Sequence, residues 1–431
     1  HTRCSCIEAS PFSENTAFAV FDGHLTGDKK TYVYKTTDFG KTWQSLTTDS
    51  LAGYAHVIRQ DPVKENLLFL GTEFGLFISV DGGGQWVEFT GNLPKAPIND
   101  LAIHPRDSDL IIATHGRGIY IIDDLEIIRQ ITPDVLGESV FVFQPGKVIH
   151  RSLNGYMRNV QGGEFIGENP LEVGKIFYYL KRRPLFGAIR VEIYDANGKM
   201  VKSMPGSGQR GLNMVEWFLR LKPPKPPKIK SHALLDFPSY GPLAPEGTYS
   251  VKLIMGKKSW ETRIELTYPE DYPHSAKSRK LKEKTIWKLY HLQNKLGYVD
   301  FVATQIKERA IGLLKDNKLK RQVVKNLKTM IRELESLRQS IVIDRDIQGF
   351  SIDQKLRERI VWHYLMVDLY AGKPTQTQLD RTEKMADEVK DVQKRFSRIK
   401  TRWLDAVNKE LIKLKRKPIT ISTEEEFQKT Q

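Results

Sequence analysis

Two stretches with one shared pattern, TTDFGKTW at 36–43 and SVDGGGQW at 79–86, decide the fold class of this chain. Both read (S or T)-x-D-x-G-x-x-W. In such a turn the Asp accepts hydrogen bonds from backbone N–H groups, the Gly permits a positive φ, and the Trp packs on the hairpin. We therefore predict a structural role for the eight pattern residues, which are Thr36, Asp38, Gly40, Trp43, Ser79, Asp81, Gly83 and Trp86.

The pattern, known as the Asp-box, belongs to a longer repeat. Asp38 and Asp81 are 43 residues apart, and Pro62 and Pro105 have the same spacing. Short apolar runs recur in the same order, at 56–59, 67–71, 76–79 and 86–89, and then at 100–104, 110–113 and 119–122. Four short strands in about 43 residues make up one propeller blade. We predict that residues 1–130 form about three Asp-box β-propeller blades, the last of them irregular.

The middle of the chain reads as a second β-region. Residues 131–155 are predicted to be a connector, and residues 156–268 an immunoglobulin- or fibronectin-like β-sandwich. The prolines of LKPPKPPKIK at 221–230 exclude a central strand and favour a stiff loop over a ligand for an SH3-like partner. The predicted strands cover 176–180, 188–194, 214–219, 248–253 and 262–267.

Helical periodicity replaces strand patterning in residues 273–417. Apolar residues step by three and four from Val323 to Ile341 and from Met385 to Trp403, which is the spacing of a buried helical seam. Breaks near 316–317, 343–351 and 371–375 divide the region into four stretches. The sequence predicts an antiparallel helical bundle followed by a tail at 418–431. The whole fold class is therefore multidomain, β followed by α.

The net charge of +15 is confined to the last third of the chain. Residues 273–431 contain 36 Lys and Arg against 21 Asp and Glu, whereas residues 1–272 contain equal numbers of both. The densest basic runs, at 318–328 and 413–417, contain no aromatic residue for base stacking. We expect no sequence-specific binding of nucleic acid, and at most a salt-sensitive attraction to an acidic partner or an anionic surface.

Several classes of protein and site have no support. The chain contains no run of about 18–20 apolar residues, the length that a transmembrane helix needs. Two cysteines, Cys4 and Cys6, exclude a disulfide framework and a Cys-rich zinc site. The chain has no glycine-rich phosphate loop, no G-x-S-x-G elbow and no H-E-x-x-H helix. We predict no cofactor and no metal.

Polar residues at strand ends identify a candidate site. In a four-stranded blade the turns after strand two lie on the same face as the connections between blades. We expect the residues at these places to gather on one rim, opposite the Asp-boxes. The catalytic candidates are Asp22, Glu73 and Asp100, and the ligand-binding candidates are His24, Tyr54, His56, His115 and Arg117.

The chemistry of this rim has open alternatives. Two carboxylates could do the acid–base work of a glycosidase. His24, His115 and a carboxylate could instead hold a metal, and each group could equally satisfy the backbone of its own turn. A sialidase mechanism is disfavoured because it needs an arginine cluster, and Arg117 is the only arginine expected on the rim.

Along nearly its whole length the chain resembles the bacterial BNR/Asp-box repeat proteins that are described as sortilin-like (VPS10-type) or glycosyl-hydrolase-like. The resemblance implies a long, extracytoplasmic protein, periplasmic, outer-membrane-associated or secreted, in which more propeller precedes these blades. It implies no proven reaction. The matching stretches are DGH at 22–24, YVYKTTDFGKTW at 32–43, LFLGTEFGLFISVDGG at 68–83, ATHGRGIYIIDD at 113–124, GENP at 167–170, GLNMVEW at 211–217, PEGTYSVKL at 245–253 and KPI at 417–419.

Two functions remain. The first is binding or assembly, in which the propeller recognises a peptide, a glycan or a partner protein. The alternative is a sialidase-like glycoside hydrolase, so the sequence leaves open whether the protein is an enzyme. Three blades cannot close a ring, and an open ring leaves strand edges and apolar faces uncovered. We therefore expect another polypeptide, or a further N-terminal region, to complete the propeller.

Overall fold

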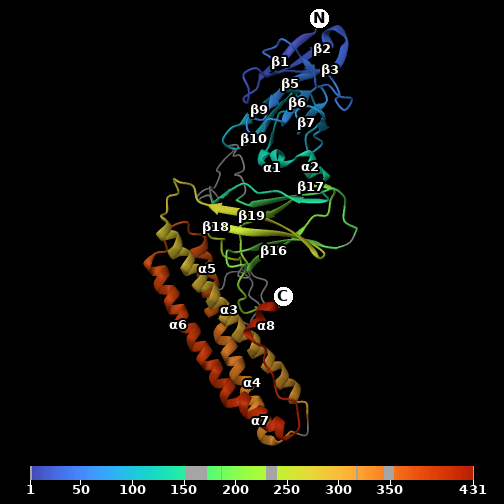
Figure 1. Cartoon of the computed structure of the whole chain (residues 1–431). Coiled ribbons are helices and arrows are strands. Elements are labelled where there is room, and N and C mark those ends of the chain that lie inside the picture. The colour runs from blue at the N-terminus through green and yellow to red at the C-terminus, as the bar shows by residue number, and fades with distance from the viewer. Residues whose placement is uncertain are drawn as a thin grey trace. The chain divides into compact units, whose positions relative to one another are not determined.

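The computed structural model describes residues 2–150, 172–185, 187–229, 240–316, 319–343 and 354–430 (Figure 1). GENP at 167–170, the start of the predicted sandwich at 156–171 and Lys318 lie outside these residues. The chain divides into two compact units, each described by itself below. One contains residues 1–147, 174–216 and 248–265, and the other contains residues 148–173, 217–247 and 266–431.

Three antiparallel sheets follow one another in residues 3–122, and in each one neighbouring strands are consecutive in sequence. The first sheet contains β1 (Arg3–Ala9), β2 (Ala17–Gly23), β3 (Asp28–Thr36) and β4 (Gln44–Ser45). The second contains β5 (Ala55–Gln60), β6 (Leu68–Thr72), β7 (Gly75–Ser79) and β8 (Val87–Glu88). The third contains β9 (Ile98–His104), β10 (Asp109–Thr114) and β11 (Ile119–Ile122).

The second sheet is covered on both faces because its strands alternate between two apolar cores. Leu68 and Leu70 of β6 pack with Val20 and Trp86 in the core shared with the first sheet. Leu67 and Phe69 point the other way and pack with residues of the third sheet, including Leu101 and Ile112. Successive sheets therefore stack face to face through the apolar side chains of these two cores.

A short helix, α1 (Leu125–Gln130), follows β11. Asp124 lies 43 residues after Asp81 and repeats the Asp of the Asp-box, whereas Glu126 and Arg129 stand where the box has Gly and Trp. Arg129, which replaces the box Trp, forms an ion pair of 3.0 Å with the fully buried Asp61 of the second unit of the repeat. It also donates to the Ser108 hydroxyl at 2.9 Å. The third sheet thus ends in a helix and a buried ion pair where the other two sheets have a fourth strand.

Among the described residues after α1, eight further strands form two sheets with the orders β12-β14-β17 and β13-β19-β18-β15-β16. Along β14 buried positions alternate with partly exposed ones, which is the pattern of a strand with one covered face. The strands are β12 (Val140–Val142), β13 (Val148–Ile149), β14 (Gly174–Leu180), β15 (Ile189–Tyr194), β16 (Met200–Gly206), β17 (Gly211–Trp217), β18 (Gly247–Met255) and β19 (Lys258–Thr267).

The predicted connector at 131–155 is more structured than a linker. It begins with α2 (Pro133–Gly137), which Thr132 caps by accepting from the Val135 N–H. Both β12 and β13 also lie in this segment, and β12 pairs antiparallel with β14. Strands of two or three residues are too short to show an alternating pattern, and this is why the sequence did not reveal them.

In the described residues the C-terminal third of the chain is helical, and its long helices end at Leu313, Ile341 and Leu369, next to the predicted breaks. The apolar seams are buried, because all six residues that step from Val323 to Ile341 are at most 2% exposed. Thr375 and Gln378 form a capping box that starts α6. The elements are α3 (Ala276–Leu313), α4 (Arg321–Ile341), α5 (Leu356–Leu369), α6 (Gln376–Ile399), the π-helical segment η3 (Lys400–Leu404) and α7 (Asp405–Lys413).

The described part of the proline-rich stretch, residues 221–229, packs on the helices, and we call it the polyproline strap. Asn294 of α3 accepts a hydrogen bond from the Lys225 N–H at 2.8 Å, and Arg357 of α5 donates to the Pro227 carbonyl at 2.8 Å. Pro224 and Pro227 are buried. These contacts are those of a stiff internal loop, which was the favoured interpretation, and they leave two of its four prolines unavailable to an SH3-like partner.

The described part of the tail, 418–430, also packs on the helices. Ile419 belongs to the helical core, and a last helix, α8 (Glu424–Lys429), starts at a capping box of Thr423 and Glu426. Its Phe427 is 6% exposed and lies against Phe301, with ring centroids 5.3 Å apart. Ile419 and Phe427 therefore anchor this segment on the helices.

Candidate functional site

The first Asp-box closes the turn after β3 through its own side chains. Asp38 accepts hydrogen bonds from the Thr36 hydroxyl, from the Thr42 N–H at 2.9 Å and from the Thr42 hydroxyl at 2.6 Å. The Gly40 N–H donates to the Thr36 hydroxyl, and Gly40 has a φ of +81°. The hydrogen bonds from Thr42, with its side chain first, hold the pKa of Asp38 below its usual range.

The second Asp-box repeats this geometry. Asp81 accepts from the Ser79 hydroxyl at 2.8 Å and from the Gln85 N–H at 3.0 Å, and the Gly83 N–H donates to Ser79. Trp86 is 3% exposed, and its indole N–H donates to the Leu46 carbonyl at 3.0 Å. In both boxes the polar groups satisfy the turn itself, so their arrangement is that of structural turns.

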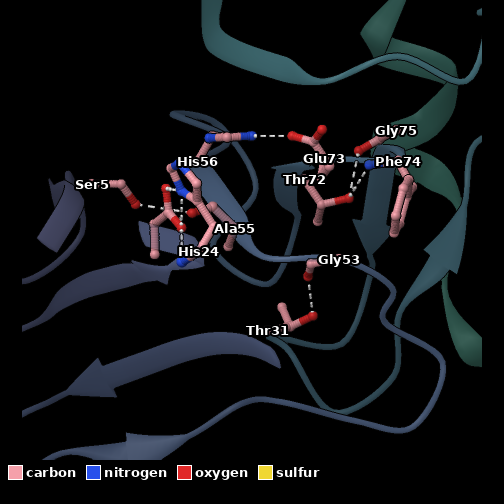
Figure 2. A network of polar contacts seen from close by, with 11 residues as sticks. Ser5, His24, Thr31, Gly53, Ala55, His56, Thr72, Glu73, Phe74 and Gly75 are labelled. Atoms are coloured by element: carbon pink, nitrogen blue, oxygen red, sulfur yellow. Dashed lines mark hydrogen bonds and ion pairs between the residues drawn. The ribbon is translucent and has the colours of Figure 1, made fainter. Parts of the chain in front are cut away.

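Five of the eight rim candidates lie together, and Figure 2 shows three of them, His24, His56 and Glu73. They come from the places that the repeat predicts: Asp22 and His24 from the end of β2, Tyr54 and His56 from the start of β5, and Glu73 from the turn after β6. We call these five residues the rim cluster. Both ends of the cluster are carboxylates, and imidazole and phenol rings lie between them.

Each carboxylate of the rim cluster contacts an imidazole. The His24 Nδ1 atom is 2.6 Å from Asp22, whose carboxylate also accepts from the His24 backbone N–H at 2.9 Å. The His56 Nε2 atom is 3.2 Å from Glu73 (Figure 2). Because an ionised carboxylate only accepts hydrogen bonds, these two ring nitrogens act as the donors.

Tyr54 lies between the two imidazoles. Its ring stacks on His24, with centroids 4.8 Å apart and planes 18° apart, and meets His56 edge-on at 5.1 Å. Burial and a hydrogen bond to Glu73 raise the pKa of Tyr54 to about 12. At neutral pH the phenol is therefore a neutral hydrogen-bond donor rather than a phenolate.

The loop that carries Tyr54 is held by contacts at its base. Glu73 donates its backbone N–H to the Tyr54 carbonyl at 3.1 Å, and the Thr31 hydroxyl donates to the Gly53 carbonyl (Figure 2). Gly53 has a φ of +78°, and a Cβ there would lie 2.9 Å from the Phe74 ring. A glycine is therefore required directly before Tyr54.

The other three candidates are not joined to the rim cluster. Asp100 lies 3.3 Å from Arg59, which also pairs with Glu8 at 2.7 Å. His115 and Arg117 are exposed, and in the described part of the chain no hydrogen bond, ion pair or ring contact connects them to the five residues. Asp100 thus belongs to a second, smaller ion-pair group, and His115 and Arg117 stay predictions.

The structure adds Phe74 to the candidates. This residue is 53% exposed, and it follows Glu73 in the turn after β6 (Figure 2). An exposed aromatic ring beside carboxylates offers a stacking surface to a sugar or an aromatic side chain. The position of Phe74, directly after β6, indicates a rim residue in the same way as that of Glu73. The sequence prediction missed Phe74 because it considered only polar residues at the strand ends.

Among the described residues, no group of three or more His, Cys, Asp and Glu side chains is placed to hold a metal ion. The two His–carboxylate pairs of the rim cluster are separated by Tyr54, and His115, the third residue of the metal alternative, is not joined to them. None of the described helices has the length and apolarity that crossing a membrane requires.

Comparisons with known proteins give no family. No family model and no curated protein sequence matches this chain. Solved structures that match include β-propeller proteins. PorZ, described as an essential bacterial surface component of the type-IX secretion system of Porphyromonas gingivalis, is 14% identical, with a TM-score of 0.23, over 61% of this chain and 30% of PorZ.

Two further matches are similarly distant. The GH74 enzyme of Niastella koreensis is 13% identical, with a TM-score of 0.26, over 61% of this chain and 46% of the enzyme. YCF48, solved with a D1 peptide, is 11% identical, with a TM-score of 0.22, over 47% of this chain and 54% of YCF48. The chain thus spans between about a third and half of these proteins. Such low scores carry no conclusion about its activity.

Proposed function

We propose that this chain is part of an extracytoplasmic β-propeller protein that acts in binding or assembly, and that the rim cluster contacts a peptide, a glycan or a partner protein. The three stacked sheets would be the blades, the following two sheets an immunoglobulin-like sandwich, and the helices an antiparallel bundle. The observation that carries the proposal is the rim cluster itself, where five side chains from three successive turns contact one another.

The contacts within the rim cluster favour recognition over catalysis. The two catalytic carboxylates of a glycosidase flank the scissile bond and act on it directly, whereas Asp22 and Glu73 are each engaged by an imidazole at hydrogen-bond distance. The raised pKa of Tyr54 opposes its use as a nucleophile. What the cluster offers to a ligand is a fixed set of ring edges and carboxylate oxygens, with His24 about 41% exposed.

The alternative is a sialidase-like glycoside hydrolase. The contact between Tyr54 and Glu73 favours it, because a tyrosine paired with an acid is the nucleophile arrangement of sialidases. This mechanism also needs cations for a substrate carboxylate. Arg117, the arginine predicted for this rim, has no contact with the rim cluster among the described residues. The hydrolase therefore ranks second.

One experiment separates the two functions. The full chain and its Glu73→Gln variant are screened on glycan and peptide arrays, and the positive compounds are then incubated with the protein and analysed by mass spectrometry. Binding proteins retain the compound intact, and binding is weakened at least tenfold in Glu73→Gln and unchanged in Asp49→Asn. Cleavage of a glycan by the wild type that Glu73→Gln abolishes would instead establish the hydrolase.

We also propose that a further sheet of the same kind covers the outer faces of the first and third sheets. Ile7 of β1 is 67% exposed, and Ile119 and Ile121 of β11 are 72% and 59% exposed. Trp43, the counterpart of the buried Trp86, is 42% exposed and donates its indole N–H to Gly40 of its own turn. A preceding sheet would give Trp43 the carbonyl partner that Trp86 finds in Leu46.

A further inference from the structure

Two basic stretches that are far apart in the sequence meet at one end of the helical unit. Arg416, three residues after α7, forms an ion pair of 2.7 Å with Asp316, which follows α3. Lys320, directly before α4, lies near Glu410 of α7, and α4 packs against α7. We call residues 315–321 and 409–417 together the basic tip, leaving out the undescribed 317–318.

Positive charge dominates the basic tip. Its two carboxylates, Asp316 and Glu410, are each paired with a cation, the second with Lys413 at 2.6 Å. The remaining cations have no carboxylate of the tip left to neutralise them. Eight exposed cations belong to the described part of the tip, namely Lys315, Lys320, Arg321, Lys409, Lys413, Lys415, Arg416 and Lys417.

An apolar side chain stands among these cations. Ile412 is 61% exposed on α7, next to Lys413 and one turn after Lys409. An isoleucine there contributes nothing to attracting phosphates, and water contact with it is unfavourable. Basic residues that surround an exposed apolar side chain are instead typical of surfaces that rest on a lipid bilayer, where the apolar group enters between the headgroups.

We propose that the basic tip binds an anionic lipid surface. Lys and Arg near such a surface are attracted by its negative potential, and this attraction fades within a Debye length, about 10 Å at 0.1 M salt. Nucleic acid fits the tip less well, because neither stretch contains an aromatic residue for base stacking. The inference uses residues outside the rim cluster and is independent of its function.

The test is co-sedimentation of the full chain with vesicles. We expect binding to phosphatidylcholine vesicles that contain about a third phosphatidylglycerol, no binding to pure phosphatidylcholine, and a loss of at least about tenfold in affinity between low and high salt. The triple variant Lys413→Gln, Lys415→Gln, Lys417→Gln should lose most of the binding. It leaves the Arg416–Asp316 ion pair in place, so the helical unit should melt as in the wild type.

Two matched controls make the result specific. The triple variant Lys384→Gln, Lys390→Gln, Lys394→Gln removes the same charge from exposed positions of α6 and should bind like the wild type. Ile412→Ser should weaken binding to vesicles and leave the salt-dependent binding to heparin or DNA unchanged. Three results would overturn the proposal. The first is an equal loss of vesicle binding in both triple variants, and the second is no binding to anionic vesicles at low salt. The third is an Ile412→Ser variant that binds vesicles like the wild type.

Discussion

Trp43 and Trp86 occupy the same position in the repeat, yet their surroundings differ. Trp86 is buried between two sheets and donates to a backbone carbonyl of the preceding one, while Trp43 is 42% exposed and donates to its own turn. Gly83 fits tightly beside Leu46, because a Cβ there would lie 2.7 Å from the leucine side chain. The Asp-box therefore serves both the turn and the packing of neighbouring sheets.

Asp38 gives the first Asp-box a dependence on pH. Its folded-state pKa is depressed by the hydrogen bonds from Thr42, so the stabilisation is present above the unfolded-state value near 3.9 and is lost as the pH falls through the folded value. We expect Asp38→Asn to lower the melting temperature at pH 7 and to approach the wild type near pH 3. Thermal unfolding by circular dichroism measures this, with the exposed Asp49→Asn as control. An equal deficit at both pH values would contradict it.

Arg129 is the residue whose loss should be most costly. Asp61 is fully buried and accepts from both the guanidinium and the backbone N–H groups of Val63 and Lys64. Arg129→Met leaves this carboxylate without its cation, and we expect a destabilisation of about 3–5 kcal/mol. Arg106→Met removes an exposed arginine paired with Asp107 and should leave the melting curve unchanged. Calorimetry measures the stability of both variants. Equally small losses of stability in the two would show that the buried ion pair contributes little.

At the scale of elements, α3 is fitted to the polyproline strap by a glycine. A Cβ at Gly297 would lie 1.9 Å from the Lys225 carbonyl oxygen, whereas a Cβ at Gly312, on the same helix, meets nothing within 4 Å. We expect Gly297→Ala to destabilise the helical unit by about 1–3 kcal/mol through overpacking. Gly312→Ala should be neutral or stabilise it by up to about 1 kcal/mol, because alanine favours helix. Denaturant unfolding followed by tryptophan fluorescence compares them, and equal stability would disprove tight strap packing.

Elements with a repeated or periodic pattern were predictable, and elements at sheet edges were not. The strands of the first two sheets are bounded by residues typical of chain reversals, such as Gly and Asp. The apolar seams of the helices extend over several helical turns. The local sequence therefore predicts both the strands and the helices. β16 (Met200–Gly206) gave no signal because it is a half-exposed edge strand that contains Pro205. For such a strand, pairing with β15 decides the conformation, and the partner lies outside the local window.

The sequence predicted which residues form the rim cluster, because the repeat places them at one end of the sheets. Asp22 and His24 lie at the end of β2, and Glu73 follows the equivalent strand β6, while Tyr54 and His56 lie at the connection that starts β5. The two sheets stack directly. The contacts themselves could not be predicted, because stacking of His24 on Tyr54 depends on the conformation of the turn after β2, which contains the short helix η1 (His24–Thr26). Asp100 was predicted for the same rim, but its carboxylate pairs with the guanidinium of Arg59 instead. Arginine binds carboxylates strongly, and the sequence does not show that Arg59 lies within reach.

At the scale of the whole molecule, the uncovered faces of the first and third sheets should make the chain associate. Exposed isoleucines on β11 lie beside an unpaired strand edge, and such a surface pairs with any available sheet. We expect light scattering of residues 1–431 to show association that increases with concentration. The double variant Ile119→Asn, Ile121→Asn should reduce it, whereas Leu25→Asn, at an 80% exposed position outside the strands, should not. A stable, monodisperse monomer at every concentration would refute the open faces as interaction surfaces, because nothing would then need to cover them.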